Sequence, residues 1–251
     1  MPKLIVVGSG IKSIAHLTEE TKKVIQLADK VLYLVNEDHL KEWIEQEAKK
    51  AESLEPIYFS DENRGVAYQN ITNYIVQEIE QFEILCVVFY GHPTVYADSA
   101  LKAAVTIREN GGEAIILPAI SSMDCLFADF QIDPGDKGLF CIDATELLIY
   151  ERNIDPYSHV ILFQPANLGR VDRQSTSNLH LLVDYLKQFY PSDYQVCIYK
   201  AAFLPGQDPN YNWTALDSVG NQLVDHQSTF YFPPLSEKAI SKKYMDLLEL
   251  T

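Results

Sequence analysis

The stretch Ile84-Leu85-Cys86-Val87-Val88-Phe89-Tyr90-Gly91-His92-Pro93 decides the fold of this chain. Its first six residues are apolar, which predicts a strand buried on both faces. The last four predict a turn, in which Gly91 allows close approach of the backbone and Pro93 stiffens the chain. A small-residue segment, Ala97 to Leu101, then predicts a helix start. Open α/β sheets bind ligands where a buried strand ends in such a turn, although an ordinary strand-to-helix turn explains the same residues.

Strand and helix patterns alternate on both sides of this stretch. Apolar runs typical of strands occupy residues 3–7, 31–35, 113–117, 138–142, 159–164, 194–200 and 228–232. Helical spacing or capping predicts helices over residues 18–28, 39–51, 61–82, 98–110, 123–130 and 177–189, and residues 56–60 read as extended. Residues 236–250 predict a final covering helix. The expected fold is α/β, with one lobe over residues 1–117, a second over 118–251, and a cleft between them.

Charge and composition limit the partners. The 251 residues carry a formal net charge of −15, and an extended nucleic-acid surface requires clustered Lys and Arg. The pairs Lys22-Lys23, Lys49-Lys50 and Lys242-Lys243 are typical of solvated helix faces instead. No apolar run approaches a membrane span, and the N-terminus lacks the basic start of a signal peptide. The sequence therefore favours a cytoplasmic protein that binds neither nucleic acid nor membrane.

The cysteines and the first glycine-rich turn give weaker signals. Cys86, Cys125, Cys141 and Cys197 show no CxxC spacing, so we expect buried free thiols and no metal site. The turn Gly8-Ser9-Gly10 resembles the start of a dinucleotide fingerprint, but Ser13 stands at the third glycine position. We interpret it as a tight turn.

Tyrosines and one arginine form the candidate reactive set: Tyr58, Arg64, Tyr68 and Tyr90. Arg64 and Tyr68 lie four residues apart in a predicted helix, so they share a face. A guanidinium there can hydrogen-bond the phenolic oxygen and favour the phenolate, which converts a tyrosine into a base. Because the chain has 15 tyrosines, a packing role is the alternative for each. No Ser-His-Asp or Cys-His arrangement stands out.

Several motifs carry a resemblance to a known family. They are VVGSG at residues 6–10, FYGHP at 89–93 and PAISSMDCLFADFQIDPG at 118–135. With the two-lobed pattern, they resemble the tetrapyrrole (corrin/porphyrin) methylase superfamily of S-adenosylmethionine-dependent methyltransferases, which have a homodimeric, two-domain, class III fold. The segments IYFSDENRGVAYQNI at 57–71 and PSDYQVCIYKAAFLP at 191–205 are most similar to the borosin peptide backbone α-N-methyltransferases.

The resemblance implies a site and a cofactor. It places the reaction at Tyr58, Arg64, Tyr68 and Tyr90, in a first lobe that forms the acceptor side. It places S-adenosylmethionine, with S-adenosylhomocysteine as product, in the inter-lobe cleft, where the early Gly-Ser-Gly turn lines the acceptor side. The implied cofactor positions are Tyr90, His92, Val95, Tyr96, Ser121, Ser122, Gln164, Tyr199 and Ala201. Our mechanistic hypothesis makes Tyr68, assisted by Arg64, the base, while Tyr58 and Tyr90 orient the amide and hydrogen-bond its oxygen.

The resemblance also implies a substrate. Fungal borosin enzymes carry their substrate peptide as a C-terminal extension, whereas this chain stops at Thr251. It therefore resembles the split bacterial form, which implies iterative amide methylation of a separate precursor peptide by a homodimer, with a heterotetramer as one possible complex. Two alternatives stay open. One is a methyltransferase for a tetrapyrrole or other small molecule, and the other is a non-catalytic relative that binds the cofactor or a partner.

Overall fold

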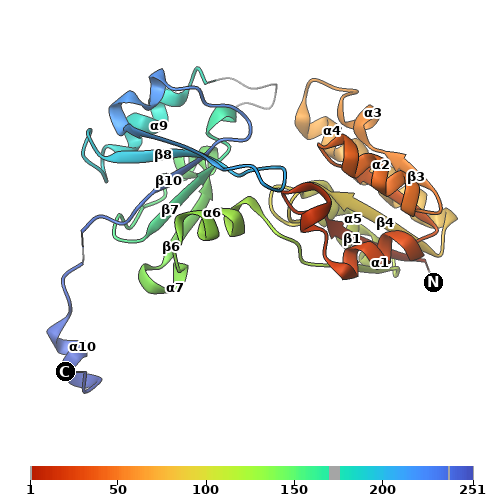
Figure 1. Ribbon diagram of the computed structural model, residues 1–251, viewed down its shortest axis with the longest axis horizontal. Coiled ribbons are helices and arrows are strands. Elements are labelled where there is room, and N and C mark those ends of the chain that lie inside the picture. Colours follow the sequence, from red (N-terminus) through yellow and green to blue (C-terminus); the bar gives the residue numbers. More distant parts are fainter. Residues whose placement is uncertain (1, 170–175, 237, 251) are drawn as a thin grey trace. The chain divides into compact units, whose positions relative to one another are not determined.

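A computed structural model describes residues 2–169, 176–236 and 238–250, which form two compact units (Figure 1). Among these residues, unit 1 consists of 2–131 and 201–210. Unit 2 consists of 132–169, 176–200, 211–236 and 238–250. Unit 1 thus extends beyond residue 117, where the sequence places the end of the first lobe, and it includes helix α6 (Ser122–Phe130).

Unit 1 is built on a five-stranded parallel sheet of order β3-β2-β4-β1-β5. Its strands are β1 (Lys3–Gly8), β2 (Lys30–Leu34), β3 (Ala51–Ser53), β4 (Ile84–Phe89) and β5 (Glu113–Ile116). Strand β4 covers the six residues that the apolar run predicts. It lies between β2 and β1, where five of its six side chains are buried, as expected for a strand covered on both faces.

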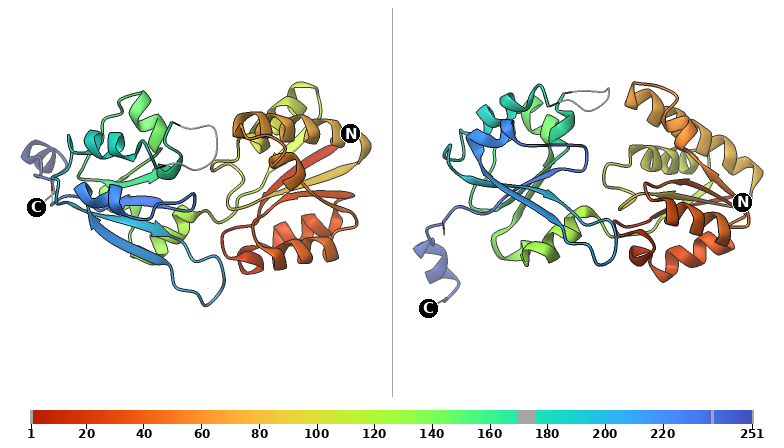
Figure 2. Two further views of the ribbon diagram at one scale, coloured as in Figure 1. Left: turned by 90° about the horizontal axis from the view of Figure 1, so that it is seen from above. Right: turned by 45° about the horizontal axis from the view of Figure 1, so that its top comes forward.

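Helices cover both faces of this sheet (Figure 2). On one face, α1 (Glu19–Leu27) and α2 (Asp38–Glu47) bury Ile25 and Ile44 against alternate strand residues such as Val88. On the other face, α4 (Arg64–Glu78) and α5 (Asp98–Glu109) bury Ile71 and Ala103 against the intervening strand residues. Single 3₁₀ turns, η1 (Ser13–His16) and η2 (Ile79–Gln81), precede α1 and follow α4. The expected α/β arrangement is confirmed for this unit.

Residues 56–60 are not extended, so that prediction is wrong. They follow the buried Leu54 and belong largely to a short helix, α3 (Glu55–Tyr58). Pro56 stands in its first turn, where a proline lacks no hydrogen bond that the helix needs. The Ser53 hydroxyl also accepts from the Glu55 amide at 3.2 Å. The predicted helix over 39–51 likewise ends early, because residues 51–53 pair with β2 as strand β3.

Unit 2 contains a mixed sheet of order β6-β7-β10-β8-β9. Its strands are β6 (Leu139–Asp143), β7 (His159–Phe163), β8 (Gln195–Lys200), β9 (Asn210–Ala215) and β10 (Thr229–Phe232). β6 is parallel to β7, whereas β10 is antiparallel to both β7 and β8. A short helix, α7 (Pro134–Lys137), precedes β6.

One face of this sheet carries the core of unit 2. Leu147 of α8 (Ala144–Ile149) and Leu182 of α9 (Leu179–Leu186) are buried there with Phe230. Two 3₁₀ turns, η3 (Pro165–Asn167) and η4 (Leu216–Asn221), contribute to the same core. Helix α8 and strand β9 were not predicted from the sequence.

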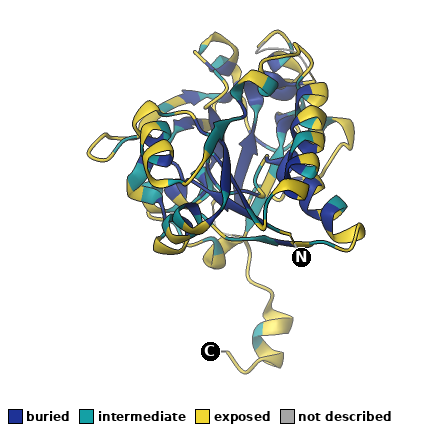
Figure 3. Cartoon of the chain, turned by 90° about the vertical axis from the view of Figure 1, so that its right-hand side faces the viewer, coloured by how far each residue is buried: buried dark blue, intermediate teal, exposed yellow. Residues whose placement is uncertain are grey.

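The predicted covering helix over 236–250 is wrong. Among the described residues of this stretch, only α10 (Lys242–Leu247) is helical, and none of its residues is buried, as its yellow and teal colours show (Figure 3). Tyr244 and Leu247 are 59% and 68% exposed. A short helix without packing is only marginally stable, and Ser241 gives α10 no side-chain cap. We therefore do not expect the helix to extend over the whole predicted range. Residue 237, inside the predicted helix, lies outside the described residues.

The cysteines, possible metal-binding clusters and possible membrane-spanning helices can be assessed over the described residues. The four cysteines are free thiols, and Cys141, unlike the other three, is exposed. In the part of the chain described, no cluster of three or more His, Cys, Asp or Glu side chains could hold a metal ion. Over the same residues, no helix has both the length and the apolar character needed to cross a membrane.

Candidate functional site

The connections of unit 1 mark one position in its sheet as a ligand site. From β1 the chain passes through α1 on one face to β2, and from β4 it passes through α5 on the opposite face to β5. The chain therefore leaves the neighbouring strands β1 and β4 in opposite directions at their carboxyl ends. Such a switch point opens a crevice, and open α/β sheets bind their ligands there. The turns Gly8-Ser9-Gly10 and Tyr90-Gly91-His92-Pro93 both lie at this point.

The two turns are in direct backbone contact. The Gly10 amide donates to the Gly91 carbonyl at 3.2 Å, and the Gly91 amide donates to the Gly10 carbonyl at 3.1 Å. Gly91 has a φ of +73°, which favours glycine. A Cβ on Gly8 would lie 2.2 Å from the Gly91 carbonyl oxygen, 2.6 Å from the Ala119 Cβ and 2.8 Å from the Pro93 Cδ. Three loops thus meet at Gly8 with no space for another atom.

Substituting Gly8 with alanine is therefore expected to destabilise unit 1 by about 1–3 kcal/mol, the usual cost of overpacking. The backbone of Gly91 cannot move without breaking its two hydrogen bonds to Gly10. The free energy of unfolding, from denaturant titration, measures the effect. Gly220→Ala is the matched control, because nothing lies within 4 Å of its added Cβ. Equal stability of the two variants would show that the loops at Gly8 yield freely.

Tyr58, Arg64 and Tyr68 form one cluster on the neighbouring helices α3 and α4. The Nη2 of Arg64 donates to the Tyr68 hydroxyl at 3.1 Å. The rings of Tyr58 and Tyr68 are stacked, with centroids 5.9 Å apart and planes inclined by 28°. Asn63 begins α4 by accepting from the Gly65 amide at 2.9 Å, which holds Arg64 in the first turn. The predicted one-turn pairing of Arg64 with Tyr68 is confirmed.

The electrostatics of this cluster favour negative charge near the guanidinium. Arg64 is half-buried, and its Nε atom is buried without a hydrogen-bond partner among the described residues. Such a charged donor is costly to leave unsatisfied, so the site is suited to accept an oxygen from outside. Burial, followed by the neighbouring Tyr68, raises the pKa of Tyr58, while Arg64 opposes the rise. Tyr58 is therefore protonated at neutral pH and can donate a hydrogen bond.

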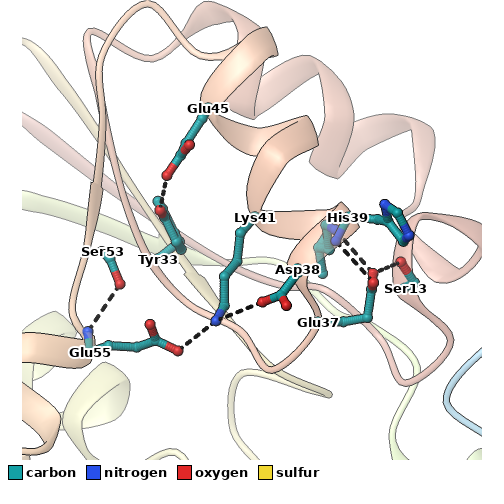
Figure 4. A network of polar contacts seen from close by, with 10 residues as sticks. Ser13, Tyr33, Glu37, Asp38, His39, Lys41, Glu45, Ser53 and Glu55 are labelled. Atoms are coloured by element: carbon teal, nitrogen blue, oxygen red, sulfur yellow. Dashed lines mark hydrogen bonds and ion pairs between the residues drawn. The ribbon is translucent and has the colours of Figure 1, made fainter.

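A polar network holds α3, which carries Tyr58, against α2 (Figure 4). Lys41 of α2 contacts the Glu55 carboxylate of α3 at 2.8 Å and the Asp38 carboxylate at 3.4 Å. The hydrogen bond that Lys41 donates to the Glu55 carboxylate is the main cause that raises the pKa of Lys41. Ser53 completes the connection through the Glu55 amide. The contact of Lys41 with Glu55 has no local sequence signal, because it joins two segments that only the fold brings together.

Tyr90 stands apart from this cluster. It follows β4, is half-buried, and makes no hydrogen bond or ring contact to Tyr58, Arg64 or Tyr68 among the described contacts. Burial, with a smaller effect of the nearby Cys125, raises the pKa of Tyr90 to about 12. The phenol is thus a donor at any physiological pH. Three of the four predicted reactive residues are brought together directly, and the fourth lies at the switch point.

Residues of the turn after β4 and of α6 were predicted to bind a cofactor. His92 and Val95 are half-buried, and the His92 Nδ1 accepts from the Thr94 amide at 3.2 Å. Tyr96 is 43% exposed and has a φ of +57°, an uncommon conformation for a tyrosine. Ser122, the first residue of α6, is half-buried. These four side chains or their backbone can therefore line a ligand at this end of the sheet.

Ser121 has a structural role that the sequence analysis missed. Its hydroxyl donates to the Asp124 carboxylate at 2.6 Å and accepts from the Asp124 amide at 3.2 Å. The same carboxylate accepts from the Ser121 amide at 2.7 Å. This is a capping box, readable in the sequence as serine followed three residues later by an acidic residue. The Ser121 hydroxyl is committed to α6.

The remaining predicted cofactor residues are Gln164, Tyr199 and Ala201. Gln164 of unit 2 follows β7 with a φ of +57°, and its Oε1 accepts from the Asn167 side chain at 2.6 Å. Tyr199 of unit 2 is fully buried in β8, next to the ring of Tyr211 at 6.0 Å. Ala201 begins the segment 201–210 that groups with unit 1, and it is half-buried. Their part in cofactor binding stays a prediction.

Comparisons with known proteins agree on one family. Residues 3–208 match the family described as Tetrapyrrole (Corrin/Porphyrin) Methylases. The methyltransferase and cyclic peptide dendrothelin A precursor of Dendrothele bispora is 35% identical over 98% of this chain and 61% of its own length. The corresponding lentinulin A precursor of Lentinula edodes is 35% identical over 95% of this chain and 59% of its own length. The chain thus spans about three fifths of the length of these relatives.

A third relative and the solved structures extend the comparison. The methyltransferase and type III borosin cyclic peptide precursor of Anomoporia bombycina is 32% identical over 95% of this chain and 28% of its own length. The crystal structure of uroporphyrin-III-C-methyltransferase from Thermus thermophilus superposes with a TM-score of 0.66 at 13% identity, covering 92% of each chain. At that identity the likeness concerns the fold, which confirms the expected class III methyltransferase architecture.

Proposed function

Because the chain belongs to the tetrapyrrole (corrin/porphyrin) methylase family, we propose that it transfers methyl groups from S-adenosylmethionine to backbone amide nitrogens of a peptide. The observation that carries this proposal is the buried Nε of Arg64, which has no hydrogen-bond partner among the described residues and lies beside the phenols of Tyr58 and Tyr68. An amide that loses its N–H proton places negative charge on its carbonyl oxygen. A buried guanidinium with a spare donor is suited to that oxygen.

The residues at the switch point of unit 1 fit the expected cofactor. The turns meeting at Gly8 bring backbone groups close together, and the half-buried His92 and Val95 follow directly. We propose that these two residues hold S-adenosylmethionine together with Tyr90, Tyr96, Ser121, Ser122, Gln164, Tyr199 and Ala201. The Ser121 hydroxyl and carbonyl both already take part in hydrogen bonds of α6, so Ser121 is proposed to line the cofactor site rather than to donate to the cofactor. When bound, the cofactor supplies an electrophilic methyl group on a sulfonium.

The tyrosines of the chain have different proposed roles: one accepts the amide proton, and two donate hydrogen bonds. Tyr68, whose oxygen accepts from Arg64 at 3.1 Å, is the proposed proton acceptor: a phenolate at this position, next to the guanidinium, would take up the amide proton. Tyr58 and Tyr90 both have raised pKa values, so they stay protonated and donate to the amide or its oxygen. Loss of the proton leaves the nitrogen lone pair free to take the methyl group that the cofactor would supply, with the S–CH3 bond breaking and S-adenosylhomocysteine as the leaving thioether.

Tyr90→Phe is expected to slow transfer by about 10²–10³-fold, the usual loss for one donor at a developing oxyanion. Since the pKa of Tyr90 is raised to about 12, the donor form persists below that pH and is lost only above it. The ratio of wild-type to Tyr90→Phe rates should therefore stay constant from about pH 7 to pH 10, an interval that ends at the ordinary tyrosine pKa. Single-turnover rates measure it, and a ratio that falls toward pH 10 would refute the donor role.

We further propose that the chain acts as a cytoplasmic homodimer on a separate precursor peptide. Support for a peptide precursor as substrate comes from relatives whose names join methyltransferase and peptide precursor. The direct test is incubation with S-adenosylmethionine and a pool of peptides, followed by mass spectrometry with fragmentation. Peptide mass rising in single-methyl steps on backbone nitrogen supports the function. Growth of an added tetrapyrrole with unchanged peptides favours the small-molecule alternative.

A further inference from the structure

Strand β9 is an edge that lacks the usual protection against pairing. It is the last strand of the unit 2 sheet, and among the described residues no strand pairs with its outer side. Its sequence, Asn-Tyr-Asn-Trp-Thr-Ala, contains no charged residue and no proline. Natural proteins usually blunt a sheet edge with charged side chains, proline or a very short strand. An edge strand without such protection can pair with a strand of another chain.

The edges of unit 1 show that protection. Strand β3 has only three residues. At β5, the Nε and Nη2 of Arg108 both donate to the Ala114 carbonyl, at 2.9 and 2.7 Å. At the opposite edge of the unit 2 sheet, Phe140 and Ile142 of β6 are partly buried against the core. Strand β9 differs from the other three edge strands. Besides lacking charged residues and proline, it exposes two aromatic side chains.

These two aromatics lie on one face of β9. Tyr211 and Trp213 are two residues apart, and they are 40% and 43% exposed. Each is supported from within the sheet: the Tyr211 ring lies 6.0 Å from that of Tyr199, and the Trp213 ring lies 6.4 Å from that of Tyr231, edge-on. Tyr199 and Tyr231 are themselves buried. Rigid, half-exposed Tyr and Trp side chains of this kind are the residues that dominate binding interfaces.

We propose that the precursor peptide binds as an added strand alongside β9, with alternate side chains against Tyr211 and Trp213. This inference rests on the proposed function and names how the peptide is held. An amide nitrogen that is to be methylated must have its N–H free, so the acceptor cannot be helical around that residue. An extended peptide fits an open edge. Pairing through main-chain groups does not depend on the side chains of the peptide. It therefore still holds the peptide when successive residues with different side chains enter the site.

Chain continuity links this edge to the unit that carries the reactive cluster. β9 begins at Asn210, the last residue of the segment 201–210 that groups with unit 1. A peptide paired with β9 therefore starts beside the point where the chain passes from one unit to the other. The polar Asn210 and Asn212 and the intermediate exposure of the aromatics suit a peptide that binds and leaves, because permanent interfaces are more apolar.

The test uses the full chain without cofactor. A pool of capped peptides about ten residues long, enough to exceed a typical strand, is selected for binding, and the tightest peptide is kept. Hydrogen exchange followed by mass spectrometry should show slower exchange at residues 210–215 and in the peptide itself. Tyr211→Lys and Trp213→Lys should each weaken binding by about tenfold or more, as for an interface hot spot. Leu223→Lys, at a residue 79% exposed in the same unit, is the matched control and should bind normally.

Several results would overturn the inference. They are the absence of any selected peptide, protection confined to other residues, or normal binding by both strand variants. A dimer of the chain that dissociates on Trp213→Lys would assign the edge to a second copy instead. Thermal melting of each variant distinguishes a loss of binding from a loss of folding. If Trp213→Lys unfolds, Tyr211→Lys still tests the binding surface. Peptides bound at β9 but never methylated would refute the proposed function alone, and peptides methylated normally by both variants would refute this docking mode alone.

Discussion

Replacing Tyr68 with phenylalanine is expected to slow peptide methylation by about 10²–10⁴-fold while the fold is retained, because the change removes only the proton acceptor. The Tyr68 oxygen accepts from Arg64 at 3.1 Å, and the ring that remains can still stack on Tyr58. Peptide mass followed over time, in single-methyl steps, gives the rate. The affinity for the peptide should change little, since the hydroxyl acts mainly as the proton moves.

Tyr74→Phe is the matched control for this prediction. Tyr74 lies on the same helix, but its hydroxyl donates to the Glu52 carboxylate at 2.5 Å, away from the reactive cluster. It should methylate at the wild-type rate. Arg64→Ala tests the same site from the other side, because it removes the cation that stabilises the phenolate. Wild-type turnover in both Tyr68→Phe and Arg64→Ala, with the fold intact, would eliminate the cluster as the reaction centre.

Replacing Lys30 with methionine is expected to lower the free energy of unfolding by about 3 kcal/mol, the lower end for breaking a buried ion pair. Lys30 is 3% exposed at the start of β2, where it contacts Glu78 and, at 2.6 Å, Glu52. The variant leaves the buried Glu78 carboxylate without its cation. Because Glu52 is 41% exposed, water relieves part of the cost. Denaturant titration at neutral pH measures the loss.

Two comparisons make the Lys30 prediction specific. Lys49→Met breaks an exposed pair with Asp29, whose side chains are 56% and 37% exposed, and should cost about 0–1 kcal/mol. The double variant Lys30→Met/Glu78→Gln should be more stable than Lys30→Met, since no buried charge is left unpaired. If Lys30→Met were as stable as Lys49→Met, the buried pair would contribute nothing.

The contact between Lys30 and Glu52 makes the stability of the protein depend on pH. Burial alone would raise the pKa of Glu52, but hydrogen bonds from Lys30 and Tyr74 outweigh it, so the pKa is lowered. A carboxyl whose pKa is lowered on folding stabilises the protein above its unfolded pKa, about 4.3 for glutamate. That stability is lost as the pH falls through the lowered value.

The elements that were predicted well are those with a strong local pattern. The run at 84–89 became β4 without a shift, because six apolar residues bounded by a Gly/Pro turn leave no alternative. Residues 56–60 were misjudged, because Pro56 suits a strand end and a first helical turn equally. Strand β9 was missed because Asn-Tyr-Asn-Trp-Thr-Ala lacks an apolar core face, and it is a strand only by pairing with β8.

The site shows the same division between local and long-range information. The pairing of Arg64 with Tyr68 follows from helical spacing alone, so the sequence was sufficient. The stacking of Tyr58 on Tyr68 depends on how α3 meets α4, and the contact of the loops at Gly8 depends on strand order. Neither is encoded in adjacent residues. The positive φ of Gln164 has no sequence signal, because it is not a glycine.

The position of Arg64 at the very start of α4 has a consequence for motion. First turns of helices open and close independently of the rest, at low free energy. Tyr68 lies one turn further in and packs against Tyr58, so it stays in place when the first turn opens. We expect such an opening to separate the Arg64 guanidinium from the Tyr68 phenol without unfolding the helix, on the nanosecond-to-microsecond timescale of loops and chain ends. The Arg64–Tyr68 contact is therefore coupled to a local order–disorder equilibrium, and we expect an acceptor oxygen that engages Arg64 to shift that equilibrium toward the ordered form.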